Sequence, residues 1–119
     1  MTEKMILGEK EVEFSASAAT PIIYKKIFSR DLLIELSQAT KLEDKAEQGS
    51  KMSDIVHGLA YVMYCEANLQ ASVLFTKLNE NSYIEWLMTI DPSAITDKSA
   101  DFIKLYQANQ KNNNHAKNA

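Results

Sequence analysis

The chain has 119 residues and a net charge of −3, and 45% of its residues are hydrophobic. A chain of this length and composition can bury one core within a single domain, so it falls outside the intrinsically disordered class. Three glycines and two prolines are too few for a many-turned β-sandwich, and the single cysteine excludes an intrachain disulfide bond.

A β-hairpin is predicted near the N-terminus, over about residues 4–16. Polar and apolar residues alternate in its second arm, which places Val12, Phe14 and Ala16 on one face of a strand. Gly8 opens a two-residue loop, as tight hairpin turns prefer. Because a lone hairpin is only marginally stable, we expect its apolar face to pack on another element.

Two helices are predicted to follow the hairpin. Thr20 is expected to cap the first helix, with Pro21 at the first helical position, where its missing N–H costs nothing. The apolar stripe of this helix comprises Ile22, Ile23, Tyr24, Ile27 and Phe28. The second helix is predicted over residues 31–39, with Ser29 as its cap and Asp31 in its first turn. The residues expected to point inward from it are Leu32, Leu33 and Leu36.

The middle of the chain combines a charged segment with the most apolar predicted helix. Residues 41–50 are charged and end in Gly-Ser, so we interpret them as a solvated linker or a frayed extension of the second helix. The helix predicted over residues 53–67 is apolar nearly all round, which is typical of a helix that is central in a bundle or contacts a partner. Gly58 can allow a neighbouring helix to approach closely, at a cost of about 1 kcal/mol in helix propensity.

Two shorter helices are predicted next. The first covers residues 72–78 and is broken by a polar run. Ser82 is a candidate cap for the second helix, because Glu85 lies three residues further on, at capping-box spacing. The residues expected to be buried from this helix are Ile84, Leu87 and Met88, with Trp86 nearby.

The C-terminal part of the chain is predicted to contain one more helix. Asp91 and Pro92 again read as a cap followed by a first-turn proline, and the last helix is expected from about residue 97 to 109. Its apolar residues are Phe102, Ile103 and Tyr106. Residues 1–110 therefore form one predicted domain, mainly α, a small helical bundle with an N-terminal β-hairpin (α+β by strict count). Residues 111–119 have no apolar periodicity and are expected to be disordered.

The sequence contains no combination of residues typical of catalysis, so we predict no enzymatic activity, cofactor or metal site. His57 and Cys65 are a conceivable base and nucleophile, but their spacing on one helix separates them by about 12 Å along its axis. Cys65 is better interpreted as a small buried hydrophobic residue. Asp31 and Glu35 are one helical turn apart and are interpreted as part of a solvated face.

A basic cluster at Lys25, Lys26 and Arg30 supports an alternative function. This alternative is a small acidic helical regulator or adaptor that binds nucleic acid or another protein. Three charges in an acidic chain make a weak nucleic-acid patch, so nucleic acid is the less favoured partner. Arg30 can instead pair with Asp31 or with a carboxylate on another helix.

No membrane association is predicted. The most apolar stretch, residues 55–65, is too short to cross a bilayer. The charged residues within residues 1–30 exclude the apolar core of a signal peptide. We therefore expect a soluble, cytoplasmic protein.

Several segments, in their order along the chain, carry a resemblance to a known family. After the strand pair come Ala19-Thr20-Pro21, Tyr24-Lys25-Lys26, Phe28-Ser29-Arg30-Asp31 and Leu32-Leu33, then the apolar helix and finally Tyr83-Ile84-Glu85-Trp86-Leu87. This order resembles the tail assembly chaperones of long-tailed, siphovirus-like phages or prophages of Gram-positive bacteria. The specific part of the resemblance is confined to residues 16–33.

The resemblance implies a non-catalytic role in phage tail assembly. Proteins of this family bind the long, helical, apolar tape measure protein and keep it soluble until the major tail tube protein polymerises around it. They act in the cytoplasm of the bacterial host, many copies at a time, and are absent from the mature virion. We therefore expect the isolated chain to self-associate or to co-purify with tape measure fragments. The apolar residues considered as partner contacts, each of which could equally belong to the core, are Tyr24, Phe28, Tyr61, Tyr64 and Trp86.

Overall fold

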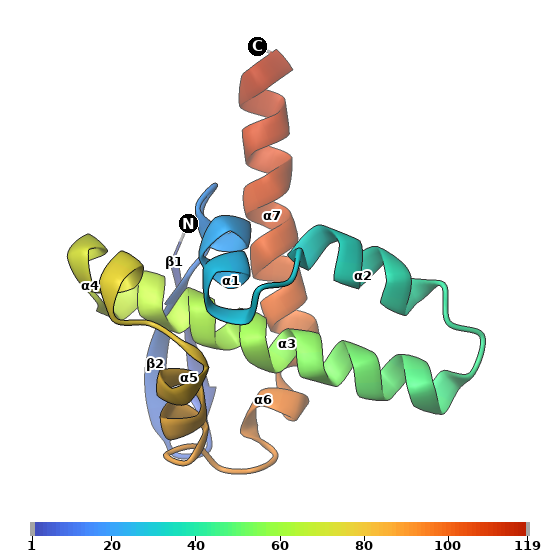
Figure 1. The fold of residues 1–119 in the computed structure, drawn as a ribbon, viewed down its shortest axis with the longest axis horizontal. Coiled ribbons are helices and arrows are strands. Elements are labelled where there is room, and N and C mark those ends of the chain that lie inside the picture. Colours follow the sequence, from blue (N-terminus) through green and yellow to red (C-terminus); the bar gives the residue numbers. More distant parts are fainter. Residues whose placement is uncertain (1, 119) are drawn as a thin grey trace.

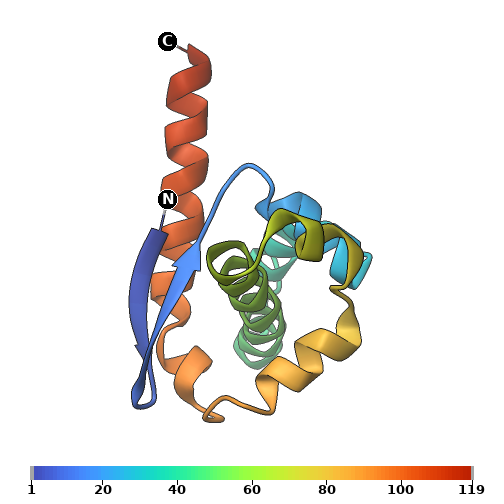
Figure 2. The same cartoon turned by 90° about the vertical axis from the view of Figure 1, so that its left-hand side faces the viewer.

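A β-hairpin followed by helices makes up the fold, which confirms the predicted class. The computed structural model describes residues 2–118, and it describes side chains at residues 2–70, 73, 74 and 76–108. The elements in chain order are β1 (Thr2–Leu7), β2 (Lys10–Ser15), α1 (Thr20–Phe28), α2 (Leu32–Thr40), α3 (Lys45–Asn68), α4 (Ala71–Thr76), α5 (Glu80–Leu87), α6 (Ala94–Asp97) and α7 (Ser99–Asn118). Helix α3 runs through the middle of the molecule (Figure 1). The hairpin and α7 lie on one side of it, and α1 and α5 lie on the other (Figure 2).

The hairpin forms as predicted and packs its apolar face on the helices. The strands are antiparallel, with Met5 opposite Val12. Gly8 has a φ of 65°, which suits the tight turn between the strands. Phe14 is fully buried, and its ring meets Phe102 of α7 edge-on, with centroids 4.8 Å apart. Strand β2 also contacts α3, so the hairpin gains its support from two helices.

The start of α1 differs from the prediction. Ala19 is the N-cap residue, and Thr20 is the first helical residue rather than the cap. Thr20 is fully buried, and its hydroxyl accepts a hydrogen bond from the Ser17 amide and donates one to Glu66. The expected capping role of Thr20 is therefore wrong, because a carboxylate on a distant helix occupies its side chain. Pro21 lies in the first turn, as predicted.

The junction between α1 and α2 also corrects two predictions. Ser29 ends α1 in a left-handed conformation, with a φ of 57°, instead of capping α2. Asp31 is the cap of α2 and accepts a hydrogen bond from the Ile34 amide at 3.0 Å. Leu32 is buried as expected, but Leu33 is 54% exposed because it lies at the edge of the face that α2 packs inward.

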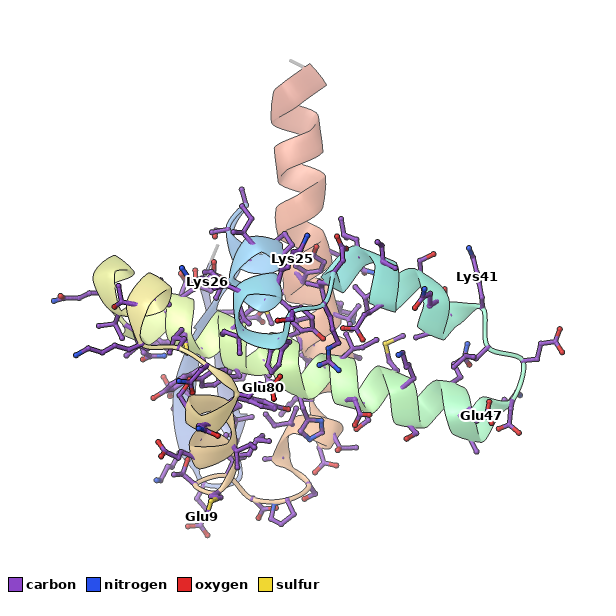
Figure 3. The ribbon with its side chains drawn as sticks, viewed as in Figure 1. Glu9, Lys25, Lys26, Lys41, Glu47 and Glu80 are labelled. Carbon is purple, nitrogen blue, oxygen red and sulfur yellow. The ribbon has the colours of Figure 1, made fainter. Side chains whose placement is uncertain are left out.

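Helix α3 is longer than predicted, since it begins at Lys45. Asp44 caps it by accepting hydrogen bonds from the Ala46 and Glu47 amides at 2.9 and 3.0 Å. Most of the expected linker is therefore the first two turns of α3. Figure 3 places Lys41 and Glu47 at the outer end of the α2–α3 pair, where the chain reverses. The prediction that this helix is central in the bundle is confirmed, because its buried residues extend from Ile55 to Cys65.

The close approach predicted at Gly58 is present. A Cβ atom added there would lie 3.1 Å from ring carbons of Tyr24 and Phe28, both on α1. This distance is tighter than nine in ten real Cβ contacts, so a larger residue at position 58 would require the two rings of α1 to shift by a few tenths of an ångström.

Helix α5 presents a different face from the predicted one. Asn79 is its cap and shares a capping box with Ser82, so Ser82 is inside the helix and is not the cap. Ile84 is 52% exposed and Met88 is 81% exposed, contrary to the expectation that they are buried. The aromatic residues Tyr83 and Trp86 determine the inward face instead, because both pack against Tyr61 of α3.

Helices α6 and α7, at the C-terminal end of the chain, both contact α3. The predicted cap at Asp91 and the first-turn position of Pro92 are wrong, because Ser93 is the N-cap residue of α6 and the helix begins at Ala94. The Asp91 side chain instead accepts a hydrogen bond from the Ser93 amide in the turn before the helix. The buried residues of α7 include Phe102 and, near the middle of the helix, Leu105 and Tyr106.

Helix α7 continues beyond residue 109, where the sequence analysis expects it to end, and it includes residues 111–118 of the tail expected to be disordered. No glycine or proline interrupts this helix. Residue 119 lies outside the described residues.

Candidate functional site

The five aromatic residues considered as partner contacts belong to one connected row of rings. Each successive pair packs edge-to-face or tilted, at the spacing typical of favourable aromatic pairs. The centroid distances along the row are 4.8 Å for Tyr24–Phe28, 4.9 Å for Phe28–Tyr83, 5.4 Å for Tyr83–Tyr61, 5.4 Å for Tyr61–Trp86, 5.2 Å for Trp86–Tyr64 and 6.5 Å for Tyr64–Phe14. The row joins α1, α5, α3 and β2, so its first role is to hold these elements together.

Burial separates these five residues into two groups. Tyr24, Phe28 and Tyr61 are at most 6% exposed, so they are core residues and not surface contacts in this structure. Tyr64 and Trp86 are half-buried and line a small cavity of about 400 Å³ beside the tip of the hairpin. The sequence cannot separate the groups, because apolar spacing identifies a helix face but does not identify what covers it.

A carboxylate expected on a solvated face is instead buried among donors. The Glu35 side chain is 9% exposed, with Arg30 Nε at 3.1 Å and Lys51 Nζ at 3.7 Å. The Tyr24 hydroxyl donates a hydrogen bond to the same carboxylate at 3.0 Å. Burial, followed by this hydrogen bond to Glu35, raises the pKa of Tyr24. The interpretation of Glu35 as solvated is wrong, because α1 and α3 fold over its side of α2.

The ion pair between Arg30 and Glu35 leaves fewer basic side chains of the cluster available to a partner. Arg30 pairs with Glu35 and also lies over the Phe28 ring, with its guanidinium carbon 5.4 Å from the ring centroid. The expectation that Arg30 pairs with a carboxylate of another helix is confirmed. Lys25 and Lys26 remain exposed on α1 (Figure 3). Two neighbouring lysines in an acidic protein present little positive charge to a phosphate backbone.

A second carboxylate contact, which is partly buried, was not predicted. Glu66 of α3 accepts hydrogen bonds from Ser17 Oγ at 2.6 Å and from Thr20 Oγ1 at 2.7 Å. Burial raises the pKa of Glu66, and these two hydrogen bonds act in the opposite direction. No sequence signal indicates this contact, since Glu66 is far from both partners along the chain.

The histidine and the cysteine considered for chemistry have structural environments. His57 Nδ1 lies 2.7 Å from the Ser53 carbonyl oxygen, one turn earlier in α3. Cys65 is fully buried, and burial raises the pKa of its thiol to about 11. Its interpretation as a buried hydrophobic residue agrees with this environment. Among the described residues, no group of three or more His, Cys, Asp or Glu side chains could hold a metal ion.

A large groove lies between α2, α3 and α7. Its volume is about 940 Å³, and its apolar lining includes Leu33 and Leu36 of α2, Met52 and Val56 of α3, and Ile103 of α7. Figure 1 shows α2 and α3 running antiparallel, with α7 crossing α3. The groove was not predicted from the sequence. The one available signal was the predicted inward position of Leu33, which faces the groove edge and not the core.

Comparisons with protein family models, with curated proteins and with solved structures found no match. Within the described residues, no helix has both the length and the apolar character needed to cross a membrane. The function proposed below therefore depends on the groove and on the resemblance noted in the sequence.

Proposed function

We propose that this chain is a non-catalytic phage tail assembly chaperone. In this proposal it binds apolar helical segments of the tape measure protein in the host cytoplasm and keeps them soluble until the major tail tube protein displaces it. The resemblance of residues 16–33 to that family suggests the partner. The observation that carries the proposal is the apolar groove between α2, α3 and α7.

The apolar lining of the groove supports a helical ligand. An amphipathic helix binds a partner by placing its apolar face in a hydrophobic groove, with side chains one turn apart as anchors. The aliphatic side chains from three helices provide such a surface, and Leu33 is 54% exposed at its edge. The net charge of −3 would help to keep a coated tape measure soluble.

The proposed binding must also be reversible. One groove engages a short helical segment, and association costs several kcal/mol in lost freedom of motion, so the affinity of each copy is modest. Many modest contacts along a long tape measure would protect it collectively and still yield to tube assembly. Self-association of the chain is compatible with this arrangement.

Substitution at two adjacent positions of α2 tests the proposal. Leu33 lines the groove and is 54% exposed, whereas Ile34 is 56% exposed but does not line it. Leu33→Glu is expected to reduce at least tenfold the amount of tape measure segment kept soluble on co-expression, because it buries a charge against the ligand. Ile34→Glu adds the same charge on the same helix and is expected to leave solubilisation near the wild-type level.

The readout is the soluble fraction and co-purification of tape measure segments from a phage or prophage that encodes this chain. Both variants should show the wild-type circular dichroism spectrum, since neither position is in the core. Equal solubilisation by wild type and Leu33→Glu, or no solubilisation of any segment by wild type, would contradict the proposal.

The regulator or adaptor alternative has less support. It depends on Lys25, Lys26 and Arg30, and Arg30 is engaged by Glu35 at 3.1 Å. We therefore retain the chaperone proposal alone. Binding of the purified chain to DNA or RNA that weakens steeply with salt would favour the alternative instead.

A further inference from the structure

Strand β1 has one edge without a neighbouring strand. The sheet that the structure describes contains β1 and β2 alone, and β2 lies between β1 and the central helix α3 (Figure 2). Among the described residues, β1 has backbone hydrogen bonds to β2 and to no other element. Such an edge presents N–H and C=O groups with which another strand can pair.

The turn of the hairpin determines which residues face this open edge. Leu7 and Lys10 flank the two-residue turn, so they form its closing hydrogen-bonded pair. The N–H and C=O groups of Leu7 therefore point to β2, and those of the residues on either side of it in the alternation point the other way. Lys4 and Ile6 thus direct their backbone groups to the open edge, where a further strand would bond to them.

The side chains on the outer face of β1 leave this edge accessible. A lysine on an edge strand commonly prevents pairing with another chain. Lys4, however, is held over its own sheet, with its Nζ 3.5 Å from a Glu11 carboxylate oxygen and 3.9 Å from one of Glu13, both on β2. Ile6, the next residue on the same face, is 58% exposed. A strand added at this edge would cover that apolar side chain.

We propose that β1 pairs with β1 of a second copy of this chain, antiparallel, with Met5 of one copy opposite Met5 of the other. The two hairpins then form one continuous sheet, and the two-fold axis of the dimer passes between the two Met5 residues. Lys4 of each copy lies opposite Ile6 of the second copy, and each of these pairs exchanges both of its backbone hydrogen bonds.

Charge selects this register from those that the backbone allows. The registers in phase with the open edge are centred on Glu3, Lys4, Met5 or Ile6, each residue opposite its own copy. Those centred on Glu3 and Lys4 place like charges directly opposite each other, which is destabilising. The register centred on Ile6 pairs only half of β1. The register centred on Met5 pairs every residue of β1 except the first, and it places no charge opposite another charge.

A second copy also accounts for both open edges at once. Pairing through a two-fold axis uses β1 of each copy, and the strand edges that remain belong to β2, which packs beside α3. The interface is small, so the dimer should be weak and dependent on concentration. Because β1 provides no residue to the groove between α2, α3 and α7, this inference is independent of the proposed function.

Cysteine cross-linking tests the register. Lys4→Cys and Ile6→Cys proteins are oxidised separately and as an equal mixture, with wild type, whose Cys65 is fully buried, as the control. Directly opposite residues of a hydrogen-bonded pair have Cα atoms about 5.5 Å apart, which a disulfide can span. Diagonal neighbours are about 7–8 Å apart, which exceeds that range. The mixture should therefore form a disulfide-linked dimer that each variant alone does not form.

The other outcomes contradict the proposed register. Cross-linking of Lys4→Cys alone would place Lys4 opposite itself, and cross-linking of Ile6→Cys alone would do the same for Ile6. Absence of a cross-link in the mixture would show that the two β1 strands do not pair.

Sedimentation equilibrium tests the interface without cross-linking, over about 10 μM to about 1 mM protein. Ile6→Lys places a lysine opposite Lys4 of the second copy, twice in the symmetric dimer, and should weaken the dimer about tenfold. Ile22→Lys makes the same change on α1, at a side chain that is 62% exposed, and should leave the dimer unaffected. Both variants should retain the wild-type circular dichroism spectrum.

A wild-type chain that stays monomeric over this range would overturn the inference, as would equal weakening by Ile6→Lys and Ile22→Lys. Failure of Leu33→Glu to reduce solubilisation of tape measure segments would contradict the chaperone proposal and leave the β1 pairing in place. Loss of the β1 dimer with normal solubilisation would have the opposite meaning.

Discussion

At the residue scale, Glu66 of the central helix α3 holds the start of α1 and the residue Ser17 before it. Its two oxygens accept hydrogen bonds from Ser17, in the connection between the hairpin and α1, and from Thr20, the first residue of α1. Burial disfavours the ionised carboxylate, and this cause outweighs the two hydrogen bonds, so the pKa of Glu66 is raised. The two hydrogen bonds favour the ionised carboxylate, but burial penalises it more strongly, so the folded state is favoured most when Glu66 is protonated.

The sign of this pKa shift predicts a dependence of stability on pH. The folded protein binds the Glu66 proton more tightly than the unfolded chain, whose glutamate pKa is about 4.3. The stabilising contribution is fully present below that value and is lost as pH rises through the raised folded-state pKa. Glu66→Gln removes this titratable group. The unfolding free energy of the variant, relative to that of wild type, should therefore increase as pH rises.

Urea unfolding of both proteins at several pH values between about 4 and 7 measures this difference. Glu85→Gln, at an exposed position of α5, controls for the loss of one negative charge. A constant difference between Glu66→Gln and wild type over this range would show that the carboxylate has the same pKa in the folded and unfolded states.

At the element scale, the crossing of α1 and α3 depends on the absence of a side chain at Gly58. Ring carbons of Tyr24 and Phe28 would lie 3.1 Å from a Cβ atom there. Both rings are also held from other sides, Tyr24 by Glu35 and Phe28 by Tyr83. The rings therefore have little room to move away from a methyl group.

Two glycines of the same helix make a matched pair for a prediction. Gly58→Ala should gain up to about 1 kcal/mol in helix propensity but lose about 1–3 kcal/mol to overpacking, so we expect a net loss of about 1 kcal/mol. Gly49→Ala meets no atom within 4 Å and should raise stability by up to about 1 kcal/mol. Thermal and urea unfolding measure both. A stabilising Gly58→Ala would mean that α1 can move away from α3 at little cost.

At the scale of the whole molecule, the buried side chains from β1 to α7 belong to one cluster. Trp86 packs against the edge of this cluster through Tyr61 and Tyr64. Elements that share one core lose their support together, so unfolding should be cooperative.

This arrangement predicts coincident unfolding transitions. The fluorescence of Trp86 reports on α5 and its contacts with α3, while far-ultraviolet circular dichroism reports on all helices. In urea, the two signals should give the same midpoint and the same slope. An earlier fluorescence transition would show that α5 detaches before the rest of the bundle and that the chain does not unfold as one unit.

Local patterns in the sequence were sufficient for the class of fold. The alternation around Val12 and Phe14, the turn glycine, and the apolar run in α3 predict the hairpin and the central helix correctly, because periodicity and turn chemistry act within a few residues. The residues at which helices begin were predicted less accurately. Thr20, Ser29 and Ser82 all have capping chemistry, but tertiary contacts or neighbouring caps placed each of them elsewhere.

The sequence by itself determined which residues are apolar, where the chain turns, and that one core is possible. Only the tertiary structure decided which apolar residues are covered. It buried Tyr24 and Phe28 against α3 and left Leu33 at the edge of a groove made by three helices. It also brought Glu35 to Arg30 and left the Tyr106 hydroxyl without a hydrogen-bond partner among the side chains that the structure describes. Such contacts depend on how distant elements pack, and hydrophobic burial, which drives that packing, is non-directional.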